Sequence, residues 1–258
     1  MRIACVQFDI AWEDPYANYA TVRALLGASG LEPGSLAILP EMFATGFSMN
    51  VDAIDDGPLQ ETQQVLADWA CRMGIYLIGG IVTRSPDGRG FNEAVAVDPS
   101  GAIISRYRKM HPFRFAGETD HYAPGDAIVT LPWGPFTVCP LICYDLRFPE
   151  LFRAAVRRGA NLFTVIANWP AAREPHWLAL LQARAIENQA YVAAVNRVGS
   201  DPSNHYAGRS LIIDPRGNLL ADAQSSPGVI GADVDFDAME RYRREFPALA
   251  DIRDDLIR

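Results

Sequence analysis

Cys143 is the residue of this chain best placed for covalent chemistry. It follows the apolar run at residues 136–142 and precedes Tyr144-Asp-Leu-Arg-Phe-Pro-Glu150, in which Pro149 suits the first turn of a helix. A side chain at such a strand-to-helix turn is lifted out of the sheet. The backbone N–H groups that follow can stabilise a thiolate or a developing oxyanion. The position favours a nucleophile, and the alternative is a small apolar cysteine buried at a strand end.

The remaining cysteines serve as a comparison for Cys143. Cys139 lies in the same apolar run, and in a regular strand its Cα would be roughly 13 Å from that of Cys143, beyond the ~7 Å limit for a disulfide. None of the cysteines has the C-x-x-C spacing of a zinc site. We therefore expect Cys5, Cys71 and Cys139 to be core residues.

Glu41 is a candidate base for this thiol. A cysteine with an unperturbed pKa of ~8.5 needs a base or a positive neighbour at pH 7. Glu41 follows the run Leu36-Ala-Ile-Leu-Pro40, so it leaves the end of a buried strand, where a carboxylate suits general-base work. The alternative is an ordinary loop carboxylate.

Lys109 is a candidate positive neighbour. It lies in the basic stretch Ser105-Arg-Tyr-Arg-Lys-Met-His-Pro-Phe-Arg114, where strand alternation places Tyr107 and Lys109 on the face opposite Arg106 and Arg108. If Lys109 faces inward, it needs a carboxylate partner and can stabilise an oxyanion beside Cys143. The alternative is a solvated edge strand whose charges prevent aggregation.

The candidate residues must be positioned by the strands and helices around them. Predicted strands and helices alternate along the chain, and this alternation predicts an α/β fold. The predicted strands are residues 3–8, 36–39, 75–83, 94–97, 103–107, 136–142, 162–167, 191–196, 210–213 and 229–234. The predicted helices are residues 15–26, 59–73, 149–158 and 175–190, and Gly74 and Gly159 suit their exits.

An internal similarity points to two related sheets. Ala94-Val-Ala-Val-Asp-Pro-Ser-Gly-Ala-Ile-Ile104 resembles Ser210-Leu-Ile-Ile-Asp-Pro-Arg-Gly-Asn-Leu-Leu220, and each reads as a strand, an Asp-Pro-x-Gly turn and a returning strand. Because no G-x-G-x-x-G follows the first strand, a doubly wound nucleotide-binding fold fits less well. The pattern favours two sheets in one sandwich with helices outside.

Composition restricts the class of protein. The 258 residues have a formal net charge of −8, which argues against nucleic acid or another polyanion as a partner. The longest apolar runs are far below the ~20 residues that span a bilayer, and the N-terminal sequence lacks the features of a signal peptide. We expect a cytoplasmic protein with no membrane contact and one domain over residues 1–258, with its positive charge concentrated at residues 106–114.

Three of these stretches resemble the nitrilase, or carbon-nitrogen hydrolase, superfamily with its Glu-Lys-Cys triad. They are Leu39-Pro-Glu-Met-Phe43, Tyr107-Arg-Lys-Met-His-Pro-Phe113 and Ile142-Cys-Tyr-Asp-Leu-Arg-Phe-Pro-Glu150, in the family's order. The resemblance implies a four-layer αββα sandwich of two mixed sheets with outer helices. It also implies a homodimer formed through those helices, and no metal or organic cofactor.

The resemblance also implies a role for each residue. Cys143 attacks an amide carbon, Glu41 moves the protons and later activates water, and Lys109 with the backbone N–H of Tyr144 holds the oxyanion. Glu118 matches the second glutamate of many members, which positions the lysine and the substrate. Asp145 and Arg147 belong to the cysteine motif, where they cap and brace the turn.

Further motifs look most like those of bacterial omega-amidases, which cleave the distal amide of 2-oxoglutaramate or 2-oxosuccinamate. They are Phe113-Arg-Phe-Ala-Gly-Glu118, Ala167-Asn-Trp-Pro170 and Gln182-Ala-Arg-Ala-Ile-Glu-Asn-Gln189. Such a substrate carries a carboxylate, for which arginine is the best geometric match, and Arg114 and Arg173 are the candidates. The aromatic residues expected to narrow the pocket are Phe43, Phe47, Phe113, Phe115 and Trp169.

Several alternatives stay open at this point. A relative of the same family hydrolyses deaminated glutathione, and more distant branches cleave carbamoyl amides or nitriles. A catalytically silent interaction scaffold is the non-enzyme alternative, and a Cys-His hydrolase is another, although the histidines show no metal-binding spacing. The C-terminal tail, about residues 238–258, is either solvated or crosses to a dimer partner.

Overall fold

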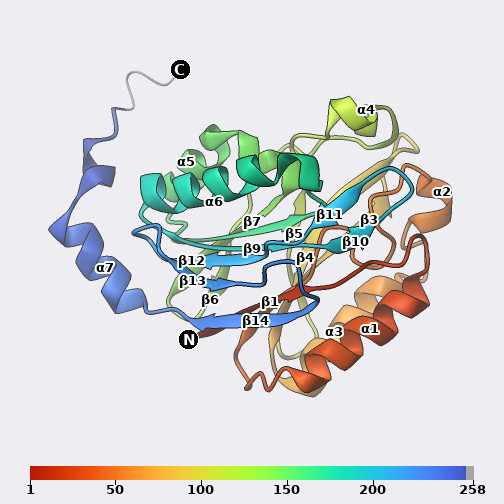
Figure 1. The fold of residues 1–258 in the computed structure, drawn as a ribbon, viewed down its shortest axis with the longest axis horizontal. Helices are drawn as coiled ribbons and strands as arrows, with labels where there is room; N and C mark the ends of the chain where they lie inside the picture. Colours follow the sequence, from red (N-terminus) through yellow and green to blue (C-terminus); the bar gives the residue numbers. More distant parts are fainter. Residues whose placement is uncertain (254–258) are drawn as a thin grey trace.

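Two mixed sheets stacked face to face form the centre of the molecule (Figure 1), which is a computed structural model that describes residues 1–253. Residues 254–258 of the predicted tail lie outside the described residues. Within residues 1–253, the first sheet runs in the order β14 (Gly228–Asp233), β1 (Arg2–Gln7), β2 (Leu36–Ile38), β3 (Tyr76–Arg84), β4 (Gly90–Val97) and β5 (Ile103–Arg108). The second runs β13 (Leu219–Asp222), β12 (Leu211–Ile213), β9 (Tyr191–Asn196), β8 (Leu162–Ala167), β7 (Phe136–Ile142) and β6 (Leu131–Trp133).

Helices cover the outer face of each sheet. Helices α1 (Pro15–Ala28) and α3 (Glu61–Met73) cover the first sheet, and α5 (Pro149–Arg157) and α6 (Glu174–Asn188) cover the second (Figure 1). The remaining α-helices of the described residues are α2 (Val51–Ile54), α4 (Glu118–His121) and α7 (Phe236–Glu245). Single 3₁₀ turns are η1 (Arg114–Ala116), η2 (Cys143–Arg147), η3 (Ala171–Arg173) and η4 (Ala248–Asp251). The predicted αββα sandwich is confirmed.

The central strands of both sheets are parallel, which explains their unbroken apolar runs. Strands β1, β2 and β3 pair in parallel, as do β7, β8 and β9. A parallel strand is covered on both faces and needs apolar residues on both. Between the sheets, Ile38 and Ile78 belong to the same buried cluster as Leu141 and Val165.

The expected ends of the helices and hairpins are confirmed. Gly74 ends α3 with φ +66°, and Gly159 follows α5 with φ +90°, a conformation that glycine adopts without strain. In each Asp-Pro-x-Gly turn the glycine N–H donates to the aspartate carbonyl, Gly101 to Asp98 and Gly217 to Asp214, both at 2.9 Å. The first turn joins β4 to β5 and the second β12 to β13, so the two hairpins lie at the edges of two different sheets.

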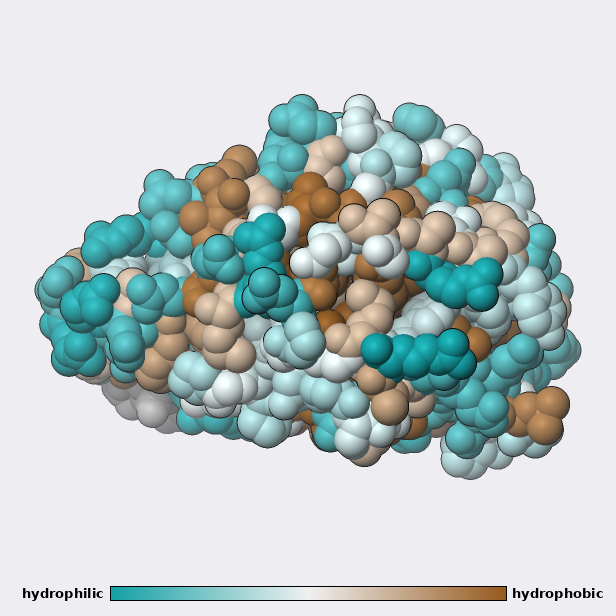
Figure 2. Space-filling model, turned by 90° about the horizontal axis from the view of Figure 1, so that it is seen from below, coloured by the Kyte–Doolittle hydropathy of each residue, from teal (hydrophilic) through white to brown (hydrophobic). Residues whose placement is uncertain are grey.

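The C-terminal segment is a helix attached to the end of α6. Asp235 caps α7 by accepting a hydrogen bond from the N–H of Ala238 at 2.9 Å, and Met239 is buried. The Arg243 side chain donates to the carbonyl of Gln189 at 3.0 Å, and the Gln189 amide donates to the carbonyl of Phe246 at 2.7 Å. This end of the molecule, at the left in Figure 2, is predominantly hydrophilic.

Within residues 1–253, every helix is too short or too polar to cross a bilayer.

Candidate active site

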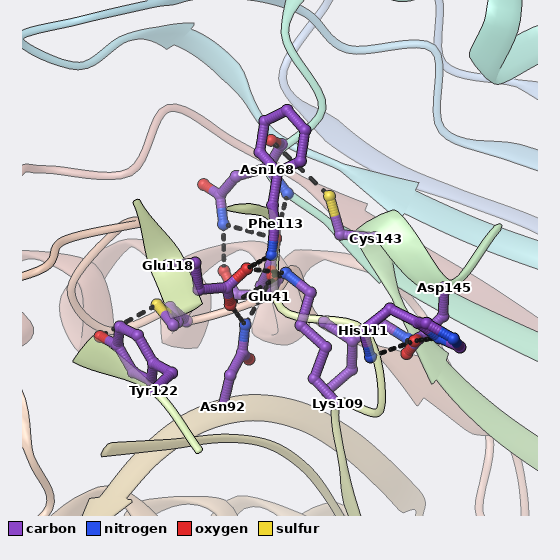
Figure 3. Close-up of polar contacts among 12 residues, drawn as sticks. Glu41, Asn92, Lys109, His111, Phe113, Glu118, Tyr122, Cys143, Asp145 and Asn168 are labelled. Carbon is purple, nitrogen blue, oxygen red and sulfur yellow. Dashed lines mark hydrogen bonds and ion pairs between the residues drawn. The ribbon is translucent and has the colours of Figure 1, made fainter. Parts of the chain in front are cut away.

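Three strand ends meet at one place between the two sheets. Glu41 follows β2, Lys109 follows β5 and Cys143 follows β7. Figure 3 shows Glu41 and Lys109 in one cluster with Asn92 and Glu118, and Cys143 and Asn168 beside it. The carboxyl ends of strands are the common location of sites in layered α/β folds, and here they bring Glu41 into contact with Asn168, 127 positions later in the chain.

A glycine in the neighbouring strand allows Glu41 to reach this position. A Cβ on Gly80 of β3 would stand 2.6 Å from the Glu41 Cα and 2.4 Å from the Met42 backbone nitrogen. Any side chain at position 80 would therefore displace the turn that carries Glu41. Met42 itself has φ +45°, so the chain bends sharply immediately after the carboxylate.

The Glu41 carboxylate is buried and accepts hydrogen bonds from residues of three other segments: β4, the end of β5 and the end of β8. Its Oε1 accepts from the Lys109 ammonium at 2.8 Å and from the Asn92 side-chain amide at 2.7 Å. Its Oε2 accepts from the backbone N–H of Asn168 at 2.8 Å, and its backbone carbonyl accepts from the Asn168 amide at 2.7 Å. The orientation of Glu41 is thus determined by hydrogen bonds on both oxygens.

Lys109 links Glu41 to a second buried carboxylate. Its ammonium donates to the Glu118 carboxylate at 3.0 and 2.8 Å, and Glu118 also accepts from Asn92 at 3.0 Å. Burial alone would lower the pKa of Lys109, but the charges of Glu118 and Glu41 outweigh it, so the pKa is raised and the ammonium stays charged. Burial raises the pKa of Glu118; the charge of Lys109 opposes this and that of Glu41 adds to it.

Cys143 occupies a strained turn at the edge of this cluster. Its φ is +46°, a region costly for a side chain with a Cβ and common at functional sites. Burial and the charge of Glu41 raise the pKa of the thiol well above its ordinary value, against the charge of Lys109. The thiol is therefore protonated at neutral pH, and a nearby base is required before it can attack.

Asp145 holds the turn that carries Cys143. Its buried carboxylate accepts from the N–H of Ile142 at 3.1 Å and from the Tyr107 hydroxyl at 2.7 Å. It also accepts from the backbone N–H of His111 at 3.0 Å, and the His111 ring nitrogen Nδ1 lies 3.0 Å from it. These contacts tie the cysteine turn of the second sheet to the segment after β5 of the first, which agrees with a bracing role for Asp145.

A cavity of about 280 Å³ opens in front of Cys143. Lys109, Tyr144 and Asn168 line it, and so do Phe47, Phe113, Phe115, Trp169 and Arg173. Tyr144 follows Cys143 at the start of η2, where a backbone N–H has no partner within the helix. A larger groove, of about 770 Å³ between α1 and α3, contains none of the candidate residues.

The structure separates some of the candidates from this cavity. Phe43 is fully buried against Tyr19 and Trp69, because the residue after the Glu41 turn points toward the helices outside the first sheet. It does not line the cavity. Arg114 is exposed on η1 and does not line it either. Of the two arginines proposed for a carboxylate, the structure places only Arg173 there.

Two further expectations were wrong. Cys71 is exposed, because it follows Ala70, a buried position of α3, by one residue and so faces away from the sheet. The positive charge at residues 106–114 is not concentrated at the site, because the buried Glu93 carboxylate pairs with Arg106 and, at 3.0 Å, with Arg108. Tyr107 and Lys109 do face inward as expected, with 0% and 1% exposure.

Sequence reasoning missed Asn92 and Asn168 as functional residues. Asn92 is buried in the middle of β4 and donates to both glutamates. Asn168 directly follows β8, so the rule that singled out Glu41 and Cys143 at strand ends would also have singled out this residue. The hairpin formed by β10 (Val198–Ser200) and β11 (His205–Ala207) was also missed, and its Ser203, Asn204 and Tyr206 complete the wall.

The cluster has the components of acyl transfer through a thiol. A protonated thiol faces a cavity, a buried carboxylate stands near it to take its proton, and a fixed ammonium lines the same cavity. Such an ammonium and a backbone N–H can stabilise the oxyanion of a tetrahedral intermediate. Among the residues described, no three His, Cys, Asp or Glu side chains are grouped so that they could hold a metal ion.

Comparison with protein families and curated sequences gives consistent matches. The model of the carbon-nitrogen hydrolase family matches residues 2–244. Omega-amidase YafV from Yersinia enterocolitica is 38% identical, with 97% of this chain and 96% of that protein aligned. A 2-oxoglutaramate amidase from Bacillus subtilis is 36% identical, with 98% of each chain aligned.

Solved structures give the same fold. XC1258 from Xanthomonas campestris, a CN-hydrolase superfamily protein with an arsenic adduct in its active site, has a TM-score of 0.90 at 36% identity and covers 98% of this chain and 97% of its own. Nit3 from Saccharomyces cerevisiae, of branch 10 of the nitrilase superfamily, has a TM-score of 0.85 at 28% identity, with 96% and 94% covered.

Proposed function

The chain belongs to the carbon-nitrogen hydrolase family and is an amidase of that family, and we propose that it cleaves the terminal amide of small omega-amido 2-oxo acids. The substrates are 2-oxoglutaramate and 2-oxosuccinamate, and the products are ammonia and the dicarboxylate. Relatives named omega-amidase and 2-oxoglutaramate amidase, aligned over nearly the whole chain, support this choice. The homodimer and the cytoplasmic location stay predictions.

The proposed reaction passes through a thioester on Cys143. Glu41 takes the proton of the thiol as Sγ attacks the amide carbon, and it gives that proton to the amide nitrogen as the C–N bond breaks and ammonia leaves. Glu41 then takes a proton from water, which attacks the thioester carbon, and the departing Sγ takes the proton back. Each proton taken by Glu41 is returned, so the enzyme ends the cycle unchanged.

Lys109 and the Tyr144 N–H stabilise the oxyanion in each half of this reaction. Glu118 acts through Lys109, because it accepts two hydrogen bonds from the ammonium. The observation that carries the proposal is that Cys143 and Lys109 line one cavity. The Lys109 ammonium also forms ion pairs with the buried carboxylates of Glu41 and Glu118.

A substrate panel tests the specificity. We expect ammonia release from 2-oxoglutaramate and 2-oxosuccinamate with a kcat/KM at least about tenfold above that for deaminated glutathione, because the shorter acids fit a cavity of about 280 Å³. The measurement is a coupled ammonia assay at matched concentrations, with a nitrile and a carbamoyl amide in the same series. Faster turnover of deaminated glutathione would assign the enzyme to that substrate instead.

Replacing Glu41 by glutamine tests its role as the base through two measurements. Hydrolysis of the amide should become slower, whereas alkylation of Cys143 should become possible at lower pH. Hydrolysis should fall by about 10²- to 10⁴-fold, the usual contribution of a general base. The charge of Glu41 raises the pKa of Cys143, so its loss should shift alkylation of Cys143 by iodoacetamide to lower pH, because the thiolate is the reactive form.

Mass spectrometry of the alkylated peptide, measured from pH 6 to 10, separates Cys143 from the other cysteines. Glu32→Gln, at an exposed position outside the site, is the matched control and should change neither readout. An unshifted alkylation profile in Glu41→Gln would show that the carboxylate does not act on the thiol.

A further inference from the structure

The side-chain amide of Asn92 uses its donors fully and its acceptor not at all. Asn92 lies in β4 and is 2% exposed, and its nitrogen donates to Oε1 of Glu41 at 2.7 Å and to Oε1 of Glu118 at 3.0 Å. Its oxygen points away from the two glutamates (Figure 3) and has no hydrogen-bond partner among the described residues. A buried acceptor without a partner is destabilising and rare in native proteins. The orientation of this amide therefore requires a reason.

The protonation state of the two carboxylates supplies that reason. An ionised carboxylate only accepts hydrogen bonds, so both glutamates, when charged, need the nitrogen of Asn92 facing them. Rotation of the amide by half a turn would bring its oxygen against two further acceptors. A protonated carboxyl group could donate to that oxygen, so the rotated amide suits a pair that holds a proton. The observed orientation is the one that two charged glutamates require.

The two glutamates carry more negative charge than their cation balances. The Lys109 ammonium lies 2.8 Å from a carboxylate oxygen of Glu41 and 2.8 Å from one of Glu118, so one ammonium faces two carboxylates. One backbone N–H group also donates to each carboxylate, whereas Asn92 donates to both. Burial raises the pKa of Glu118, so this carboxylate takes up a proton readily if its donors are lost.

Other ionisable groups near the pair do not supply the missing positive charge. Cys143, Tyr122 and Tyr206 interact electrostatically with at least one of the two glutamates, and burial raises the pKa of all three, so they are neutral at pH 7. The next residue of β4, Glu93, faces the opposite side of the sheet and pairs with two arginines there. Of these groups and Lys109, only the lysine is positively charged, and the remaining negative charge depends on neutral donors.

The sheet holds Asn92 in place independently of its side chain. Strand β4 pairs with β3 on one side and with β5 on the other, and the Asn92 carbonyl accepts from the backbone N–H of Lys109 at 2.9 Å. A different side chain at position 92 therefore removes the two amide donors while the backbone contact to Lys109 remains. This separation makes the role of the amide testable.

We propose that Asn92 is a positioning residue that keeps Glu41 and Glu118 charged at the same time, so that Glu41 is ready to take the thiol proton at neutral pH. A base must be deprotonated before the reaction begins, and a proton shared between two neighbouring carboxylates would prevent this. Asn92 does not line the cavity, so it acts through the glutamates. The inference rests on the proposed function, in which Glu41 is the base for Cys143.

Asn92→Leu tests the role of the amide, because leucine has a similar size but neither donates nor accepts a hydrogen bond. We expect the acid limb of the pH profile of kcat/KM for 2-oxoglutaramate to move up by at least about one pH unit, as the loss of one charge-assisted hydrogen bond implies. The activity lost at pH 6 should return in large part at pH 8, where the glutamates are charged again. Initial rates of ammonia release from pH 5 to 9 are the measurement. A purely structural role predicts a loss of the same size at every pH, and that result would overturn the inference.

Asn188→Leu is the matched control. Asn188 is also fully buried, its nitrogen donates to the carbonyl of Arg184 at 3.0 Å, and its oxygen has no partner among the described residues. It lies at the end of α6 and outside the cavity. This variant should lower the unfolding temperature but leave the acid limb at its wild-type position.

Asn92→Ala provides a second test in case leucine does not fit, because alanine removes the same donors and adds no bulk. It should move the acid limb in the same direction as Asn92→Leu. Thermal unfolding of each variant confirms that it is folded. An unshifted limb in the folded Asn92 variants would show that the amide does not control the charge of the pair.

Infrared spectroscopy separates this inference from the proposed function, because it needs no substrate. A protonated carboxyl group has a C=O stretching band that a carboxylate lacks, and the band that Glu118→Gln removes belongs to this pair. As the pH is lowered, that band should appear at least about one pH unit earlier in Asn92→Leu than in the wild type. Equal pH values would overturn the inference. Failure of the wild-type enzyme to release ammonia from any amide of the series would instead overturn the proposed function, while the infrared comparison still decides the role of Asn92.

Discussion

Cys143→Ala should abolish ammonia release from 2-oxoglutaramate, with kcat lower by about 10⁴-fold or more, as for other enzymes that lose a covalent nucleophile. The reason is that the thioester cannot form without Sγ, while the cavity and the Glu41–Lys109 pair remain. The fold should survive, because the side chain is small and borders the cavity, so its loss opens no closed void in the core. Initial rates with each amide, and thermal unfolding of both proteins, are the measurements.

Cys139→Ala is the matched control for this prediction. Cys139 lies in β7, four positions before Cys143, and is fully buried. Burial raises its pKa to about 12, so it is no better ionised than the nucleophile. Cys139→Ala should lower the free energy of unfolding by about 1 kcal/mol, because removal of the sulfur leaves a small cavity in the core. It should leave kcat near the wild-type value.

The outcome also decides between the alternatives for Cys143. If Cys143→Ala kept amide hydrolysis, or if no acyl-enzyme could be trapped on the wild-type protein, the thiol mechanism would be wrong. A Cys-His hydrolase is a poor description of this cavity, because no histidine is among its described lining residues. The His111 ring instead stacks on Phe148 at 3.6 Å and contacts Asp145.

Lys109→Met should destabilise the protein by about 3–5 kcal/mol at pH 7, the usual cost of removing one partner of a buried ion pair. Without the ammonium, the Glu41 and Glu118 carboxylates, both 0% exposed, are left together without a counter-charge. Hydrolysis should also fall below detection, because the oxyanion loses its cation. Urea unfolding followed by circular dichroism gives the free energy of unfolding.

The pH dependence of that loss identifies its cause. In the wild type, the charge of Lys109 lowers the pKa of Glu118 against burial, so its removal raises that pKa further. A carboxyl whose folded-state pKa lies above its unfolded value, ~4.3, is favoured when protonated and destabilises the fold as pH rises. The difference in stability between Lys109→Met and wild type should therefore be smallest near pH 4 and largest above pH 7.

A double variant provides the control for Lys109→Met. Lys109→Met with Glu118→Gln removes one of the two unpaired carboxylates and should recover part of the lost stability at pH 7. If the single variant were equally destabilised at pH 4 and pH 7, lost packing against Phe47, whose ring centre is 5.1 Å from the ammonium, would be the cause instead of charge.

Much of the fold was predictable because its signals are local. Continuous apolar runs marked the parallel strands, and glycine and proline marked the ends of α3 and α5. The two Asp-Pro-x-Gly turns identified a hairpin in each sheet. The short strands β6, β10 and β11, each of three residues, were missed because three residues are too few to show a period. Strands β2 and β12 are equally short but were predicted, because each is an unbroken apolar run.

For the site, residue type and position at a strand end made Glu41, Lys109 and Cys143 candidates but left a structural alternative for each of them. The resemblance of three motifs to the carbon-nitrogen hydrolase family then favoured the catalytic interpretation. The packing of the two sheets decided the rest. It brings Asn92 across to both glutamates, directs Phe43 to the outer helices and leaves Arg114 in solvent. It also places Arg147 beside Arg173 in the wall of one cavity. Sequence periodicity reports which face of an element a side chain occupies, but which partner that face meets depends on contacts between distant segments, and those exist only in the folded chain.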